Sequence, residues 1–276
     1  MKNSKLLLLA PLAFQSAMAE EVTGGWQFQL TPYLWLPTIS GKLNYDIPSN
    51  NNNGGSARVD VGPTDWLDLL NGAFLLQGEA RKERFLIFSD VIYLGLESDD
   101  DRVVSVLSGT GDRLPVDAST NLNTSTDIDG FAVTLAGGYN LLRDARLSLD
   151  VFAGTRYFSI EAKTSWNLSV DVELPGGGTV LARQGSVDSD QEFWDVLVGT
   201  KGATNIGNGN WSLNYYLDVG TGDADLTWQA LAGASYAFGW GGLMISYRHL
   251  EYDLGSQGLM QDFSFSGPMF GARFSF

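Results

Sequence analysis

Apolar and polar side chains alternate along most of the chain, in segment after segment, between residues that favour turns. In residues 211–220 (WSLNYYLDVG) an apolar residue occupies every second position, and the same period recurs in 147–157 and 226–238. Successive side chains of a strand point to opposite faces, so each segment has one apolar and one polar face. The pattern therefore predicts β-strands.

These segments are too long for an ordinary soluble sheet. They run for roughly 10 to 14 residues, whereas strands of soluble proteins average about five or six. Aromatic residues gather near the segment ends, with Trp26, Trp211, Phe238 and Trp240 on one side and Trp194, Trp228 and Tyr252 on the other. Membrane-spanning strands need about 9–11 residues and carry aromatic girdles at both interfaces. A membrane barrel is thus favoured over a soluble sandwich.

The pattern predicts ten strands, near residues 25–37, 72–82, 84–97, 128–141, 145–161, 192–205, 210–221, 226–238, 242–253 and 262–276. Tight turns at 82–84, 142–144, 207–209 and 239–241 alternate with loops at 46–71, 98–127, 162–191, 222–225 and 255–261. The predicted fold is all-β, a transmembrane antiparallel up-and-down β-barrel of about ten strands with both termini in the periplasm. Eight or twelve strands stay open, because 38–45 or 163–173 would extend strands or add a hairpin.

The first residues predict a secretory signal peptide. Lys2 and Lys5 precede an apolar run over residues 6–14, and Ala17-Met18-Ala19 provides small residues for cleavage. We expect a signal peptide over 1–19 and a single outer-membrane barrel domain over 20–276. Removal of the signal peptide leaves 15 basic against 32 acidic residues, a net charge of −17. Such a chain repels nucleic acid, so no nucleic-acid partner is expected.

The two ends of the mature chain resemble known outer-membrane proteins. The last strand carries Phe274 and closes on Phe276, which resembles the assembly signal of Gram-negative outer-membrane proteins. The resemblance implies insertion by the barrel-assembly machinery into the lipid and lipopolysaccharide of the outer membrane. Residues 26–36 (WQFQLTPYLWL) resemble an uncharacterised proteobacterial family of small porin-like barrels with a TPYLW-type motif. That resemblance implies a fold and a location and brings no catalytic residues.

If the apolar faces meet lipid, the opposite faces line the lumen. A basic side chain facing lipid costs about 2–4 kcal/mol near the bilayer midplane, so the charges of the strands belong inside. The expected polar network of the lumen comprises Glu79, Arg81, Asp90, Asp150, Arg156, Asp195, Lys201, Asp218, Arg248 and Arg273. Leu86 and Phe88 share the face of Asp90, which leaves the parity of that strand open. Ten strands favour a filled lumen with paired charges over a narrow aqueous path.

Two functions follow from this fold. The first is an integral outer-membrane barrel that is structural or a narrow, cation-preferring passive channel. The alternative is a surface module that binds a ligand or divalent cations through acidic loops, because carboxylates ligate calcium. The acidic residues concerned are Asp99 to Asp101, Asp127, Asp129, Asp188, Asp190, Glu192, Asp223 and Asp225. In the loop 46–71, Thr64 is expected to cap a short helix that rests Trp66 and Leu70 on the rim.

Enzymatic activity is not expected. The sequence has no nucleophile motif, no phosphate-binding loop, no cluster of metal ligands and no feature that calls for a cofactor. His249 is the only histidine, and Glu251 shares its side of the strand. This pair leaves a rim-active enzyme as the less favoured alternative, since an interfacial histidine commonly bonds to its neighbour.

Overall fold

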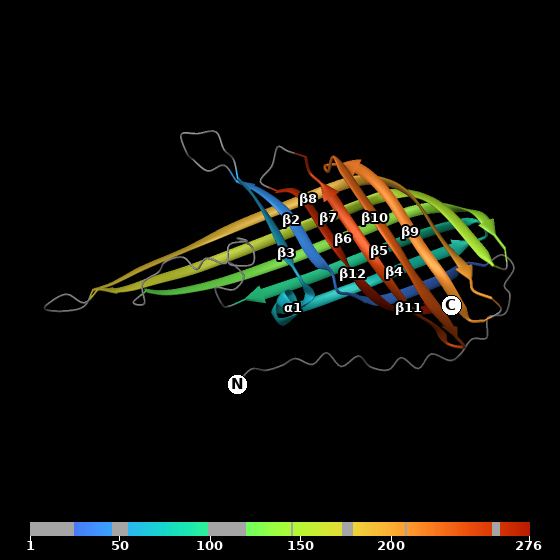
Figure 1. Cartoon of the computed structure of the whole chain (residues 1–276), viewed down its shortest axis with the longest axis horizontal. Coiled ribbons are helices and arrows are strands. Elements are labelled where there is room, and N and C mark those ends of the chain that lie inside the picture. Colours follow the sequence, from blue (N-terminus) through green and yellow to red (C-terminus); the bar gives the residue numbers. More distant parts are fainter. Residues whose placement is uncertain are drawn as a thin grey trace.

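Ten antiparallel strands close into a barrel (Figure 1). The computed structural model describes residues 25–45, 55–98, 120–144, 146–172, 179–207, 209–255 and 260–276. The barrel strands are β1 (Gln27–Trp35), β4 (Leu70–Lys82), β5 (Phe85–Ser98), β6 (Thr120–Arg143), β7 (Leu147–Val172), β8 (Thr179–Asn205), β9 (Trp211–Gly222), β10 (Leu226–Phe238), β11 (Gly241–Asp253) and β12 (Met260–Ser275). Strand β1 pairs with β4, β4 to β12 follow in chain order, and β12 pairs back with β1. The predicted ten-stranded barrel is confirmed.

Two further strands form a hairpin on this barrel. They are β2 (Thr38–Tyr45) and β3 (Gly55–Val61). Strand β12 pairs with β1 up to the register Trp35↔Met269 and then with β2 from Thr38↔Ser266 onward. Strand β2 therefore continues the line of β1 beyond a break at residues 36–37. Together β2 and β3 form the extra hairpin that the sequence left open for residues 38–45.

The predicted loop at 98–127 is wrong over residues 120–127, while residues 99–119 lie outside the described residues. The predicted loop at 162–191 is wrong over most of its length, and the strand extension over 163–173 that the sequence left open is present in β7. Strand β6 already begins at Thr120, β7 runs to Val172 and β8 begins at Thr179. Their outer parts pair only with each other and project beyond the barrel, at the left of Figure 1. We call residues 120–125, 164–172 and 179–187 the projecting sheet. The period of two continues through residues 164–172 of β7, where apolar residues occupy almost every second position, but it is lost in residues 120–125 and 179–187.

The two ends of the barrel differ. One end, the turn end, carries the short connections at 83–84, 144–146, 206–210 and 239–240 together with the start of β1 and Phe276 (Figure 1). The opposite end, the loop end, carries the β2–β3 hairpin and the projecting sheet. Within the described ranges, no helix has the length and apolar character needed to span a bilayer.

A short helical segment links β3 to β4 at the loop end. It consists of α1 (Pro63–Trp66) and the 3₁₀ turn η1 (Leu67–Leu69). Its N-cap is Gly62, whose N–H donates to Asp65 Oδ2 at 2.9 Å, so the prediction of Thr64 as the cap is wrong. Trp66 is buried, and its Nε1 donates to the carbonyl of Pro37 at 3.0 Å. The helix is thus anchored in the break between β1 and β2 rather than laid on the rim.

The outer face of the barrel carries an apolar belt. Phe28, Leu34, Ile87, Val196 and Ile245 are each between 46% and 67% exposed and belong to strands all around the wall. Large apolar side chains exposed on every strand are not tolerated in water and match a lipid-facing surface. The expected girdle is partly correct. Trp26, Trp211, Phe238, Trp240 and Trp194 are exposed, but Tyr252 is fully buried inside the barrel and belongs to no girdle.

Candidate functional site

The lumen brings together most of the charged residues of the barrel wall. Alternation sends Arg248 and Tyr252 of β11 inward while Ile245 and Tyr247 point outward. On β5 the inner face is mixed. Leu86, Phe88, Asp90 and Ile92 are all buried, and Phe88 packs edge-on to Phe152 with ring centroids 4.9 Å apart. The face of Asp90 is therefore the inner one, and it looks ambiguous in the sequence because both faces of this strand are apolar.

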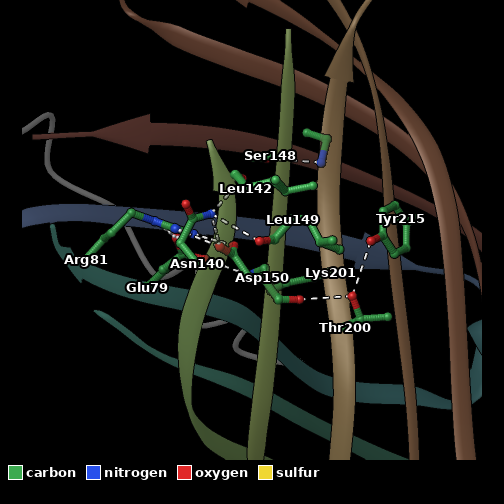
Figure 2. A network of polar contacts seen from close by, with 11 residues as sticks. Glu79, Arg81, Asn140, Leu142, Ser148, Leu149, Asp150, Thr200, Lys201 and Tyr215 are labelled. Atoms are coloured by element: carbon green, nitrogen blue, oxygen red, sulfur yellow. Dashed lines mark hydrogen bonds and ion pairs between the residues drawn. The ribbon is translucent and has the colours of Figure 1, made fainter. Parts of the chain in front are cut away.

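The first group of paired charges lies toward the turn end (Figure 2). Arg81 of β4 donates to both carboxylate oxygens of Asp150 of β7, at 3.0 and 2.7 Å. It also contacts Glu79 at 2.9 Å, and Glu79 receives Lys201 of β8 at 2.6 Å. Asn140 adds a hydrogen bond to Asp150 at 2.6 Å. Two carboxylates and two cations from three strands thus neutralise each other, in the arrangement that makes charge-assisted bonds strong.

A second group crosses the middle of the lumen. Arg248 of β11 contacts Asp90 of β5 at 2.9 Å and donates to Gln229 at 3.0 and 2.6 Å. Tyr33 of β1 donates to the other oxygen of Asp90 at 2.6 Å, and its hydroxyl accepts from Arg248 at 3.1 Å. The guanidinium also lies 4.7 Å from the ring centroid of Trp35. This group joins opposite walls of the barrel through almost fully buried charges.

A third group lies around Arg156 of β7. Its guanidinium forms a fully buried ion pair with Asp218 and donates to the hydroxyls of Thr134 and Thr227 at 3.2 and 3.3 Å. Two expected members of the network stand apart from these groups. Asp195 accepts the backbone N–H of Ala224 at 3.0 Å. Arg273 lines the lumen, and its Nε has no hydrogen-bond partner among the described atoms.

An aromatic cluster fills the lumen toward the loop end, and the sequence analysis missed it. Phe158 has its ring centroid 5.2 Å from those of Tyr252 and Phe263, and Tyr252 stacks on Phe263 at 4.7 Å. Phe193 and Phe265 complete the cluster at 6.1 and 6.2 Å from Phe158. Parity pointed to it, because Phe158 lies two residues after Arg156 and Tyr252 lies four residues after Arg248. Aromatic residues near strand ends were assigned to the girdle instead.

A polar cavity of 210 Å³ lies between the first and second groups. Gln29, Glu79, Lys201 and Arg273 are among its walls, together with the less polar Phe88, Tyr216, Leu231 and Met244. Carboxylates and cations balance in its lining. Within the part of the chain that the structure describes, no three side chains of His, Cys, Asp or Glu gather in a metal-binding arrangement. The lumen therefore contains a small polar chamber beside its paired charges.

The remaining candidates lie outside the lumen. Asp127, Asp129, Asp190 and Glu192 fall within the paired strands β6 and β8, not in loops, while Asp223 follows β9. Asp99 to Asp101 and the side chain of Asp188 lie outside the described residues. Phe274 and Phe276 face outward at the turn end and are 41% and 64% exposed. His249 lies on the outer face of β11, hydrogen-bonded to both Glu251 and Ser266.

Comparison with known proteins finds only distant structural similarity. No family model matches the chain, and no curated protein matches it. Solved structures similar to it include the outer-membrane protease OmpT of Escherichia coli, at 10% identity and a TM-score of 0.47, covering 92% of this chain and 98% of that one. The translocator domain of the autotransporter NalP of Neisseria meningitidis is 14% identical, with a TM-score of 0.39 and coverages of 91% and 88%. The toluene transporter TodX of Pseudomonas putida is 10% identical, with a TM-score of 0.32 and coverages of 91% and 88%.

The fold is that of a bacterial outer-membrane β-barrel. Closed antiparallel topology, the exposed apolar belt and buried charges paired inside the lumen all belong to this class. The fold alone does not decide between an enzyme, a channel and an anchor.

Proposed function

We propose that the protein is a closed barrel of the outer membrane that anchors the projecting sheet and the β2–β3 hairpin at the cell surface. The observation that carries this proposal is the filling of the lumen at successive levels. Arg248 pairs with Asp90, Arg156 pairs with Asp218, and the aromatic cluster follows toward the loop end. A barrel of ten strands is close to the size that side chains alone can fill.

An open state of this lumen has a high free energy. The side chains of Arg248 and Asp90 are only 2% and 8% exposed, so separating them leaves two charges without compensation. Breaking such a pair costs about 3–5 kcal/mol, which makes the separated state about 10²–10⁴-fold rarer than the paired one. Rings packed at 4.7 to 6.2 Å must also move before ions pass. We therefore favour the structural alternative over the cation-preferring channel.

The same proposal includes orientation and partners. Short turns mark the periplasmic side of outer-membrane barrels and long extensions the outer side, so the turn end faces the periplasm. Export uses the signal peptide at 1–19, and the barrel-assembly machinery recognises β12 together with the Phe276 that follows it. The acidic positions of β6 and β8, such as Asp129 and Asp190, then face the polar headgroups of lipopolysaccharide, where divalent cations bridge carboxylates and phosphates.

Two measurements on the mature chain test this proposal. Vesicles containing the refolded barrel should lose trapped potassium at the rate of protein-free vesicles, whereas a closed lumen is refuted by faster loss that scales with the amount of barrel. Protease added to intact cells should cut within the projecting sheet and leave a protected barrel. Protection of that sheet in intact cells, with cleavage only after the outer membrane is permeabilised, would reverse the proposed orientation.

A further inference from the structure

Three side chains form a hydrogen-bonded line on the outer face of the barrel near the loop end. His249 of β11 and Ser266 of β12 are direct partners in the register of these strands. The Nδ1 of His249 lies 2.5 Å from Ser266 Oγ, and its Nε2 lies 3.0 Å from Glu251 Oε2. A hydroxyl, an imidazole and a carboxylate are therefore connected in that order.

The chemistry of the partners fixes the role of each ring nitrogen. An ionised carboxylate only accepts hydrogen bonds, so Glu251 selects the tautomer of His249 with its proton on Nε2. Nδ1 then carries the lone pair and faces the Ser266 hydroxyl. The ring of Trp228 packs on the imidazole with centroids 4.5 Å apart, which restricts its rotation. A nucleophile in contact with a base that a third group orients is the arrangement of serine hydrolases.

The line lies where the apolar belt ends. On the same face of β11, Leu243, Ile245 and Tyr247 are 48%, 52% and 57% exposed, and the polar pair His249 and Glu251 follows directly. On β12 the exposed Phe270 lies on the same outer face, four residues after Ser266. The transition from lipid-facing to polar side chains marks the boundary between acyl chains and headgroups. Ester carbonyls of membrane lipids occupy this level.

We propose that Ser266, His249 and Glu251 form a membrane-facing catalytic triad that hydrolyses an acyl ester of a lipid in the outer leaflet. This activity goes beyond the closed-barrel role and does not depend on the state of the lumen. It also departs from the expectation of no enzymatic activity, because Ser266 is seventeen residues from His249 and only the strand register brings the two together.

The reaction proceeds in two steps. Ser266 Oγ bonds to the ester carbonyl carbon while its proton moves to His249 Nδ1 and an electron pair moves onto the carbonyl oxygen. Thr38, the register partner of Ser266 on β2, places a hydroxyl on the same face for that oxygen. The C–O bond to the lipid alcohol then breaks, and the alcohol takes the proton from Nδ1. Water, deprotonated by His249, hydrolyses the acyl-serine to the fatty acid and restores Ser266.

The test uses the refolded full-length mature barrel and two independent readouts. An alkyl fluorophosphonate should label the folded protein at Ser266, as located by mass spectrometry of peptides. Vesicles of phosphatidylethanolamine and phosphatidylglycerol, and parallel vesicles containing lipopolysaccharide, should release fatty acid. Release in the first set assigns a glycerophospholipid substrate, and release only in the second assigns an ester-linked acyl chain of lipopolysaccharide.

Matched variants separate catalysis from structure. Ser266→Ala should abolish labelling and release, whereas Ser264→Ala, on the same outer face of β12, should retain both. His249→Asn should slow labelling about 10²-fold or more, because proton transfer contributes about 10²–10⁴-fold. Folding of each variant is verified by its heat-dependent mobility shift on gels. A folded barrel that is not labelled at Ser266 overturns the triad, and labelling without fatty-acid release from either vesicle overturns the lipid-ester assignment.

Discussion

Replacing Arg248 with Met would leave a buried carboxylate without its cation. The change removes the contact with Asp90 at 2.9 Å and the two hydrogen bonds to Gln229. Both charged side chains are less than 10% exposed, so no discount for solvent screening applies. Met fills much of the volume of the arginine stem, which keeps the cavity term small. We expect Arg248→Met to lower the free energy of unfolding by about 3–5 kcal/mol.

Two further variants make the interpretation specific. Combining Arg248→Met with Asp90→Asn removes both charges while Tyr33 can still donate to the amide oxygen, so at least half of the loss should be recovered. Lys163→Met removes the pair with Glu161, which is shorter, at 2.6 Å, but has side chains 55% and 46% exposed. That loss should be about 0–1 kcal/mol, because exposed pairs contribute little.

The assay is equilibrium unfolding in urea of the barrel refolded into lipid vesicles, followed by tryptophan fluorescence. The difference in unfolding free energy between each variant and the parent gives the magnitudes directly. Two results would refute the reasoning. One is an Arg248→Met variant as stable as Lys163→Met, and the other is a double variant no more stable than Arg248→Met alone.

Three other predictions concern separate parts of the fold. Gly199→Ala would place a Cβ 2.3 Å from the carbonyl oxygen of Leu217 and 2.4 Å from the ring of Phe152, so it should lower the urea midpoint by the equivalent of about 1–3 kcal/mol; an unchanged midpoint would show that the ring and the neighbouring strand both shift freely. Trp66→Phe removes the hydrogen bond to Pro37 and should cost about 1 kcal/mol in the same assay, whereas no loss would mean that packing alone anchors the helix. Two backbone N–H groups at 2.8 Å hold the pKa of Asp144 below its ordinary value of 3.8. A carboxylate with a lowered folded-state pKa stabilises the protein above pH 3.8 and ceases to do so as the pH falls. The difference in unfolding free energy between Asp144→Asn and the parent should therefore shrink in acid. A difference independent of pH would show that the Asp144 carboxylate is not the source of that stability.

The membrane-spanning part of the fold was predictable because lipid imposes a simple rule. Every spanning strand must present apolar side chains outward, so period two located ten strands and sent Arg156 and Arg248 inward. The rule does not locate the point where a strand leaves the bilayer, because β7 keeps an apolar residue at every second position from Trp166 to Val172. It also misleads where the inner face is apolar, as for Tyr252, which alternation alone does not separate from a girdle residue.

Pairings between strands were the part that the sequence could not provide. The contact of Arg81 with Asp150 joins residues 69 positions apart, and that of Arg248 with Tyr33 joins residues 215 positions apart. Such contacts depend on barrel closure and on the tilt of the strands, neither of which alternation encodes. The same holds outside the lumen, where the register of β11 on β12 sets Ser266 beside His249. Glu251 was foreseen because it is a neighbour on the same strand.

The measurement that tests the closed lumen most directly is single-channel conductance of the refolded mature barrel in planar bilayers. A closed barrel predicts a silent record from protein shown to be folded by its heat-dependent gel shift. A variant with Phe158, Phe263 and Arg248 all replaced by Ala, which removes the centre of the aromatic cluster and the mid-lumen cation, should show discrete steps. Discrete, cation-preferring steps from the unmodified barrel would contradict the account and identify its charged lumen as a conducting path.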